Sequence, residues 1–297
     1  MNHNKIVLGL LLSLAGFLTE LQGQEVTYRN YDNFENETLR TLKESGAVST
    51  FNSMHNLKRQ TLQVRANTLV PVTLKAVNKK PISGEKLVDE CSEGIMVVSR
   101  YAPKIIQGER VVAGASCVVL TEDGVCVSNY HVFEPIIDSS KELTPLDSIF
   151  FVASKSGKIY PITAVLSYNK TSDLAIFKID PHGDKLTTVS VGKDLPAGAT
   201  IQALTHAYGH LFYYSKGVVA RNICGSELNP DTNRSDITAD YCKGSSGGPL
   251  FDECGNLVGI VSTTQSIYYT EYPQTDLQMV VKTIIPISSV LRLLKQQ

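Results

Sequence analysis

A chain of 297 residues is longer than the usual single domain and has room for a two-part domain preceded by an extension. Its composition, 42% hydrophobic and 19% charged, favours a packed core over a disordered chain. The formal net charge of −1 excludes the strongly basic surface typical of nucleic-acid-binding proteins, so we expect no nucleic-acid partner.

The first 23 residues have the pattern of a secretory signal peptide. Lys5 supplies a positive charge, and residues 6–18 form an apolar run that is too short for an ordinary membrane-spanning helix. Cleavage is expected near Gly23 or Gln24, and no cysteine follows the run to carry a lipid anchor. This pattern predicts a secreted or periplasmic protein with no membrane insertion after signal cleavage. The alternative is an uncleaved membrane anchor.

Residues 24–93 are more polar and less regular, and we assign them to an N-terminal extension of unknown role. Helical patterns cover 33–43 and 83–91, the second with Ser83 as its N-cap. Residues 61–77 favour one or two strands, interrupted at Pro71. Three interpretations stay open for the extension: a pro-region, an interaction arm, or a segment that packs on the remaining chain.

From residue 94 onward, short runs rich in β-branched residues alternate with turn signals. The first set predicts one antiparallel barrel over about 94–183. Its expected strands are 95–101, 110–120, 125–129, 148–153, 159–167 and 174–179.

A second set of strands follows over about 184–297 and predicts a second barrel. Helical spacing of Val290, Leu291 and Leu294 predicts a C-terminal helix over 288–295. The expected strands are 187–191, 200–205, 211–220, 235–239, 249–251, 257–264 and 277–285.

The most informative stretch is the glycine-rich run at 241–250, Tyr-Cys-Lys-Gly-Ser-Ser-Gly-Gly-Pro-Leu. A tight turn there would project the hydroxyl of Ser246 and point the amides of Gly244 and Ser246 at one spot, as an oxyanion hole requires. The alternative is a glycine- and serine-rich loop without chemistry. A serine hydroxyl is inert without a base, so a catalytic role also needs a histidine and a carboxylate.

Both groups are present upstream in suitable contexts. His131 follows an apolar strand, and Asp173 opens the alternating strand 174–179. Asp173 would accept a hydrogen bond from His131 and fix its tautomer, and His131 would take the proton from Ser246. The order His131, Asp173, Ser246 is that of chymotrypsin-type enzymes, which differs from the order in subtilisin and in the α/β-hydrolases.

Over about residues 94–295 the chain resembles trypsin-like serine peptidases of the chymotrypsin fold, especially the bacterial HtrA-type branch. The resemblance implies two six-stranded antiparallel β-barrels, with the histidine and aspartate on the first, the serine on the second and the site in the cleft between them. The chain ends soon after the second barrel, so we expect no PDZ domain. The segments that carry the resemblance are 114–120, 123–124, 128–132, 173–175 and 257–262.

One departure from this family concerns activation. Trypsin-like zymogens carry an aspartate directly before the nucleophile, where it pairs with a new N-terminus after cleavage. The residue here is Ser245, so we expect no activation by that route.

The sequence suggests which residues contact the substrate, but it does not decide which substrate side chain is preferred. Ser262, Thr263 and Thr264 should pair with the substrate backbone as an added strand, and Thr264 should narrow the pocket. Asp240 lies where enzymes selective for Arg or Lys carry a pocket carboxylate; the alternative is a surface position. Lys282 could neutralise Asp240 or favour an acidic side chain, so the preferred residue stays open.

No cofactor or metal is expected, because the chain has no Cys-x-x-Cys pair and the spacing of His206 and His210 fits a loop better than a ligand pair. The oligomeric state stays open. The chain has six cysteines, for which we predict no pairing: residues 91, 117, 126, 224, 242 and 254.

The leading hypothesis is a secreted or periplasmic serine endopeptidase acting on polypeptides, with ester hydrolysis as a variant of the same chemistry. The main alternative is a silent or latent protein-binding module on the same fold. A third is an envelope-interaction protein in which residues 24–93 do the binding.

Overall fold

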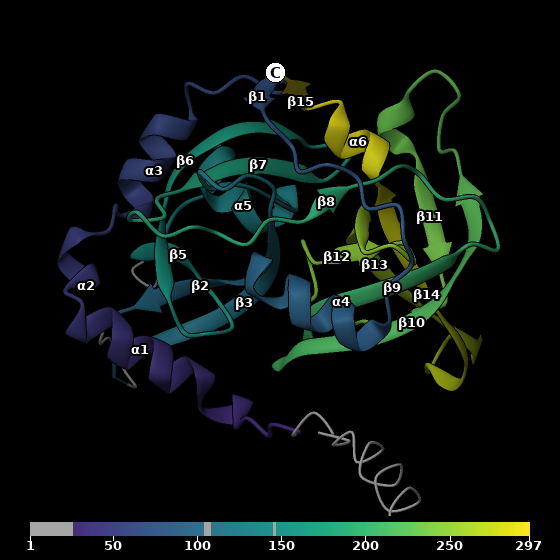
Figure 1. Ribbon diagram of the computed structural model, residues 1–297, viewed down its shortest axis with the longest axis horizontal. Helices are drawn as coiled ribbons and strands as arrows, with labels where there is room; N and C mark the ends of the chain where they lie inside the picture. Colours follow the sequence, from purple (N-terminus) through teal and green to yellow (C-terminus); the bar gives the residue numbers. More distant parts are fainter. Residues whose placement is uncertain (1–25, 104–107, 145–146) are drawn as a thin grey trace, which may run out of the picture. The chain divides into compact units, whose positions relative to one another are not determined.

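Two closed β-barrels form the body of the computed structural model, which describes residues 26–103, 108–144 and 147–297 (Figure 1). The predicted signal peptide lies outside these residues. The first barrel has six antiparallel strands in the order β2-β3-β4-β7-β6-β5. Its strands are β2 Ile95–Ala102, β3 Arg110–Val119, β4 Val125–Ser128, β5 Ile149–Ala153, β6 Ile159–Asn169 and β7 Leu174–Ile179.

The second barrel closes through six strands in the order β12-β9-β10-β11-β14-β13, because β12 also pairs with β13. A short parallel strand, β8, is added on β13. The predicted pair of antiparallel barrels is therefore confirmed. The bounds are β8 Ser190–Val191, β9 Thr200–Ala207, β10 His210–Ile223, β11 Arg234–Ile237, β12 Pro249–Phe251, β13 Asn256–Thr270 and β14 Thr275–Pro286.

One of these strands, β13, is much longer than the 257–264 that the sequence predicted. Strand β13 continues to Thr270 and β14 begins at Thr275, so their hairpin projects beyond the barrel (Figure 1, lower right). Only residues 282–284 of β14 pair with β11, and the strands beyond that point pair only with each other. We call the projecting part, residues 265–281, the ribbon.

Short helices dominate the N-terminal extension. The predicted helices at 33–43 and 83–91 are confirmed, and the Ser83 hydroxyl accepts from the Lys86 amide at 3.2 Å. The elements are η1 Tyr31–Asn33, α1 Phe34–Glu44, α2 Ala47–Thr50, α3 Met54–Thr61, β1 Val70–Val72, α4 Gly84–Cys91 and η2 Ser92–Gly94.

The prediction of a strand break at Pro71 is wrong, because Pro71 lies inside β1. Strand β1 pairs in parallel with β15, Leu294–Gln296, through the Val70 amide and the Val72 carbonyl. The nitrogen of Pro71 faces away from that partner, so its missing N–H removes no hydrogen bond. The same pairing shortens the predicted C-terminal helix 288–295 to α6, Ile287–Leu291, because the chain leaves the helix to join β1.

The extension packs into the hydrophobic core. Leu42 on α1 and Met54 and Leu57 on α3 are fully buried, and the last two share a cluster with Phe133 and other first-barrel residues. The ammonium group of Lys58 donates to the Pro135 carbonyl inside the first barrel's helix, α5 (Tyr130–Ile137), and to the carbonyls of Asp138 and Lys141, which follow that helix. Of the three interpretations of the extension, its contacts agree with the packed segment.

This packing predicts a large loss of stability when α3 is truncated inside the core. Leu57→Ala should lower the free energy of unfolding by about 3 kcal/mol, because the lost methyl groups leave a cavity. Leu62, at the end of the same helix, is 47% exposed, and Leu62→Ala should change that free energy by only about 0.5 kcal/mol. Urea unfolding of both variants tests this; equal losses would show that α3 is not packed as described.

Candidate active site

The three residues predicted for catalysis lie in one hydrogen-bonded line. The His131 Nδ1 is 2.9 Å from Oδ2 of Asp173 and 3.1 Å from Oδ1, and His131 Nε2 is 2.9 Å from the hydroxyl of Ser246. The side chains of His131 and Asp173 are 47% and 20% exposed, so the histidine faces solvent while the carboxylate is more enclosed. The geometry fits a nucleophile, a base and an orienting carboxylate.

Local backbone structure sets the position of the imidazole and the carboxylate. His131 is the second residue of α5, Tyr130–Ile137, which begins directly after β4 and Asn129. Its backbone amide also donates to Asp173 Oδ1 at 3.0 Å, so two donors of one residue hold the carboxylate. Asp173 has a φ of 57°, a left-handed conformation that aspartate tolerates better than most residues, and this turn precedes β7.

A buried asparagine, which the sequence analysis did not single out, connects the two barrels at this point. The side-chain amide of Asn129 donates to the Asp173 carbonyl at 3.0 Å. Its oxygen accepts from the Gly247 amide at 2.6 Å, one residue after Ser246. Asn129 is fully buried, and its position between an apolar strand and the histidine is the sequence signal that could have identified it.

The serine loop also rests directly on the first barrel. The carbonyl of Ser246 accepts from the Ser116 amide on β3 at 2.7 Å. Gly247 has a φ of 78° and lies against the Ser116 carbonyl and the Ser128 hydroxyl. Any side chain at Gly247 would collide with these groups, so this glycine permits the close approach of the two barrels.

The backbone around Gly244 is arranged to leave its amide available. The Lys243 carbonyl accepts from the Tyr208 amide at 2.7 Å. Since the C=O and N–H of a trans peptide point in opposite directions, the Gly244 amide points away from Tyr208. Gly244 has a φ of 92°, and within the described parts of the chain neither its amide nor that of Ser246 donates to another group. Both amides are therefore free to bind an oxyanion.

The serine before the nucleophile points into the protein. Ser245 is fully buried, and its hydroxyl donates to the hydroxyl of Thr205 at 2.9 Å. No carboxylate occupies this position to pair with a new N-terminus.

The predicted specificity residues lie close to the loop but form a different arrangement from a closed acidic pocket. The side chain of Asp240 is 69% exposed and pairs with Lys282 at 3.0 Å, so the surface interpretation of Asp240 agrees with the structure. The buried Tyr241 occupies the interior instead. Its hydroxyl lies 2.9 Å from the Thr263 carbonyl and 2.6 Å from that of Thr283, which oppose each other in the β13–β14 pair.

Strand β13 runs past the loop. The Val261 amide donates to the Gly248 carbonyl at 2.9 Å, and Ser262, Thr263 and Thr264 follow directly. Thr263 and Thr264 are exposed. Their backbone is therefore placed beside the nucleophile, where an added strand could pair with it.

Two cavities border the line of side chains. One of about 270 Å³ is lined by His131 and Ser246, and one of about 360 Å³ is lined by Gly244 and by Glu35 of α1. The Glu35 carboxylate accepts from the Ala113 amide at 2.8 Å, so the extension contributes a wall of the second cavity.

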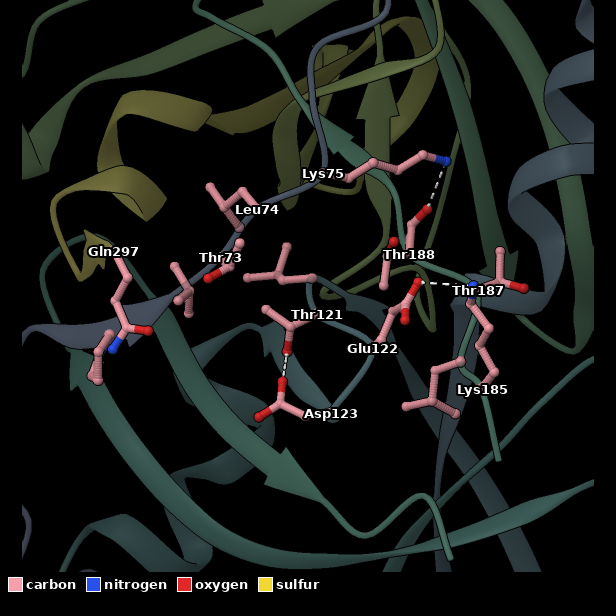
Figure 2. A pocket seen from close by; sticks show the side chains of 14 residues that line it. Thr73, Leu74, Lys75, Thr121, Glu122, Asp123, Lys185, Thr187, Thr188 and Gln297 are labelled. Carbon is pink, nitrogen blue, oxygen red and sulfur yellow. Dashed lines mark hydrogen bonds and ion pairs between the residues drawn. The ribbon is translucent and has the colours of Figure 1, made fainter. Parts of the chain in front are cut away.

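A further cavity of about 860 Å³ lies elsewhere, between β1, the β3–β4 turn and the start of the second barrel (Figure 2). Its charged groups are engaged with neighbours: Lys185 pairs with Glu122 at 3.4 Å, and Lys75 donates to the Thr188 carbonyl. None of the three predicted catalytic residues lines it, and it has no nucleophile–base pair, so we do not assign the active site there.

All six cysteines are described, and none forms a disulfide. Cys117 and Cys126 lie on neighbouring strands but are not opposite each other, as expected from the turn between them. The loop predicted around Tyr208 and Gly209 is a two-residue turn between β9 and β10. His206 is the last residue but one of β9, and His210 begins β10.

Comparisons with known proteins show what the chain is similar to. Residues 115–260 match the family model of the trypsin-like peptidase domain. The chain is 30% identical to Protease Do-like 5, chloroplastic, of Arabidopsis thaliana, over 48% of this chain and 45% of that protein. It is 29% identical to a probable periplasmic serine endoprotease DegP-like of Brucella suis, over 51% of this chain and 28% of that protein.

A solved structure of the HtrA-type protease AlgW with a decapeptide superposes with a TM-score of 0.53 at 18% identity, covering 71% of this chain and 66% of that one. At this identity the likeness shows the fold alone. The chain spans less than half the length of the curated relatives it matches first.

The buried histidine behind the loop predicts a pH-dependent stability. Burial lowers the pKa of His206 to about 3 from the ordinary 6.5, and its Nδ1 accepts from the Phe212 amide. Between these pH values the unfolded chain binds the proton and the folded chain does not, so stability falls as the pH falls below 6.5. From pH 6.5 to 4.5 the loss from this residue should be about 2 kcal/mol.

His206→Asn keeps an acceptor for Phe212 and removes the titrating group. Its free energy of unfolding should therefore decline less than that of the wild type between pH 6.5 and 4.5, by about 2 kcal/mol. Urea titrations at several pH values measure the difference. Parallel curves for the two proteins would mean that His206 is not held neutral in the folded state.

Proposed function

Because this chain carries a trypsin-like peptidase domain, we propose that it is a secreted or periplasmic serine endopeptidase that hydrolyses peptide bonds in polypeptides. The observation that carries the proposal is the line of contacts from Asp173 through His131 to the Ser246 hydroxyl. A binding module on this fold would not need a carboxylate, a base and a nucleophile in contact.

The reaction follows from these contacts. Asp173 keeps the proton of His131 on Nδ1, so that Nε2 accepts the proton of Ser246 as its oxygen attacks the substrate carbonyl. The amides of Gly244 and Ser246 stabilise the negative oxygen of the tetrahedral intermediate. His131 then gives the proton to the leaving amine, and water hydrolyses the acyl-enzyme with His131 again as base.

On the substrate side, we propose that Ser262, Thr263 and Thr264 pair with the backbone of an extended polypeptide. The exposed, ion-paired Asp240 gives no support for a preference for Arg or Lys. Beside it, the Lys282 ammonium group also donates to the Tyr241 carbonyl.

For localisation, the proposal of secretion or a periplasmic site rests on the predicted signal at residues 1–23 and on the name of the DegP-like relative. In the described residues, no helix has the length and apolarity that crossing a membrane requires. We further propose the division into a signal peptide, an extension at 24–93 and a peptidase domain at 94–297. The burial of the extension supports its role as part of the folded body.

Covalent labelling tests the proposed nucleophile. A fluorophosphonate should label the mature chain, and Ser246→Ala should abolish the labelling and lower peptide hydrolysis by at least about 10⁴-fold. Ser245→Ala is the matched control, because that neighbouring hydroxyl bonds to Thr205 in the interior, and this variant should still be labelled. Labelling that survives in Ser246→Ala, or none in folded wild-type protein, would contradict the proposal.

Because Asn129 bridges the two barrels, a substitution at this position should lower activity even though all three triad residues are retained. Asn129→Asp keeps an acceptor for Gly247 but faces the Asp173 carbonyl with a second oxygen, so kcat should fall by about 10²-fold with a smaller change in KM. Steady-state kinetics on a fluorogenic peptide measures both constants. Wild-type kcat in Asn129→Asp would show that the bridge does not position the reacting groups.

A further inference from the structure

The outer edge of β13 continues far beyond the active-site cleft. Past Val261, the residues from Ser262 to Thr270 pair with β14 on one edge, and among the described residues they pair with no strand on the other. The open edge begins beside the serine loop, where the Val261 amide donates to Gly248. It is therefore one continuous row of backbone groups that starts at the nucleophile and runs along the ribbon.

This edge lacks the charges and prolines that often keep a strand from pairing with another chain, although its pairing with β14 shifts register at Ser262 and between Ile267 and Tyr268. Residues 262–270 read Ser-Thr-Thr-Gln-Ser-Ile-Tyr-Tyr-Thr, with no charged residue and no proline. Exposed edges of natural sheets are usually protected by charges, proline or a covering segment. An uncharged, β-favouring edge of this length is a template for an added strand.

The ribbon also exposes apolar side chains. Ile267, Tyr269 and Met279 are 41%, 81% and 55% exposed, and the first and last oppose each other across the two strands. Leu277 is 54% exposed and opposes Tyr268. Apolar groups clustered on a projecting two-stranded element mark a surface that binds another chain.

The base of the ribbon is fixed in place. Tyr241, five residues before the nucleophile, contacts the opposed carbonyls of Thr263 and Thr283. Lys282 donates to the Tyr241 carbonyl and pairs with Asp240. The segment that carries Ser246 and the start of the ribbon are thus tied together, so a chain bound along β13 keeps a defined position relative to the nucleophile.

We propose that the free edge of β13 along the ribbon binds the substrate polypeptide well upstream of the bond that is cut, and that it favours extended, apolar, uncharged segments. The proposal rests on the proposed endopeptidase function. Suppose that a substrate strand runs antiparallel to β13 and that its last residue before the scissile bond lies beside Ser262. The third residue before that bond then lies beside Thr264. Because the rise per residue is the same along both strands, the sixth to eighth residues before the scissile bond lie beside Ile267 and Tyr269.

Continuity with the cleft identifies the occupant as substrate. A polypeptide whose scissile bond lies at Ser246 must pass the first residues of this edge, and the same strand can continue along the ribbon without a break in pairing. Self-pairing of the ribbon with a second copy would use the edge without involving the nucleophile, and the test below separates the two.

The test compares two peptide substrates with the same scissile sequence, one with three residues and one with eight before the cut bond. The added residues are apolar and uncharged. We expect kcat/KM of the longer peptide to be about tenfold higher. In a shortened variant, in which an Asn-Gly turn replaces residues 267–279 and joins the opposed Ser266 and Val280, the ratio should fall to about one.

A matched control keeps the ribbon and changes an exposed apolar residue elsewhere. Leu228 is 97% exposed on the connection between β10 and β11, and Leu228→Ser should keep the tenfold ratio. A ratio near one in the wild type, or a tenfold ratio that survives in the shortened variant, would overturn the proposal. The proposal would also be overturned by a different pair of results. In these, sedimentation velocity shows concentration-dependent dimers that disappear in the shortened variant, and the wild-type protein cleaves the two peptides equally.

Binding measurements keep this test separate from that of the catalytic function. If fluorophosphonate labelling and cleavage are both absent, the proposed function fails, and fluorescence anisotropy with the Ser246→Ala full chain still compares the two peptides. About tenfold tighter binding of the longer peptide, lost in the shortened variant, would support the ribbon site. Equal dissociation constants would overturn it.

Discussion

The contact between the two barrels at the serine loop is the constraint on which the rest of the site depends. Ser246, the proposed nucleophile, belongs to the second barrel and His131, its proposed base, to the first, so their 2.9 Å separation exists only if the barrels keep one relative position. Short hydrogen bonds at Ser246 and Gly247 fix that position, to the Ser116 amide and the Asn129 side chain. Because both bonds are buried, breaking either one leaves polar groups without water, which makes the arrangement costly to distort.

The N-terminal extension supports this contact from outside the barrels. Helix α3 buries Met54 and Leu57 in the cluster that also contains Phe133 of α5. His131 is the second residue of that helix. The Lys58 ammonium group holds the carbonyls at the end of the same helix. The helix that carries His131 is therefore packed against residues far upstream in the chain.

Much of the fold could be predicted from sequence because its signals are local. Alternating strands, the turn at Gly124 and the glycine-rich loop each depend on a few consecutive residues, and the barrels follow from them. The β1–β15 pair could not be predicted, since it joins residues about 220 positions apart and overrides both the proline signal at Pro71 and the helical spacing near Leu294. Local patterns do not encode which distant edge a strand will meet.

The residues of the candidate site were likewise predictable only where their sequence signals are local. The order and context of His131, Asp173 and Ser246 predicted a triad, and the structure brings the three side chains into contact. Asn129 and Tyr241 were missed because their contacts are bonds to segments distant in sequence. Asp240 was considered for the pocket because of its distance from the serine alone, yet Lys282, across from it on β14, pairs with it at the surface. Spacing from a motif thus predicts where the backbone lies better than it predicts which way a side chain points.

The position of Tyr241 links specificity to the ribbon. This ring is buried under β13 and β14, and the Asp240 carboxylate lies outside in its ion pair with Lys282, so Asp240 does not place a charge inside a closed pocket. Under the proposed endopeptidase function, we infer that recognition extends over a longer stretch of the substrate. Backbone pairing along an uncharged edge provides such recognition, because each added residue contributes main-chain hydrogen bonds whatever its side chain. The same tyrosine that fills this interior also contacts the base of the ribbon, so one residue connects the proposed site beside Ser246 with the proposed extended one.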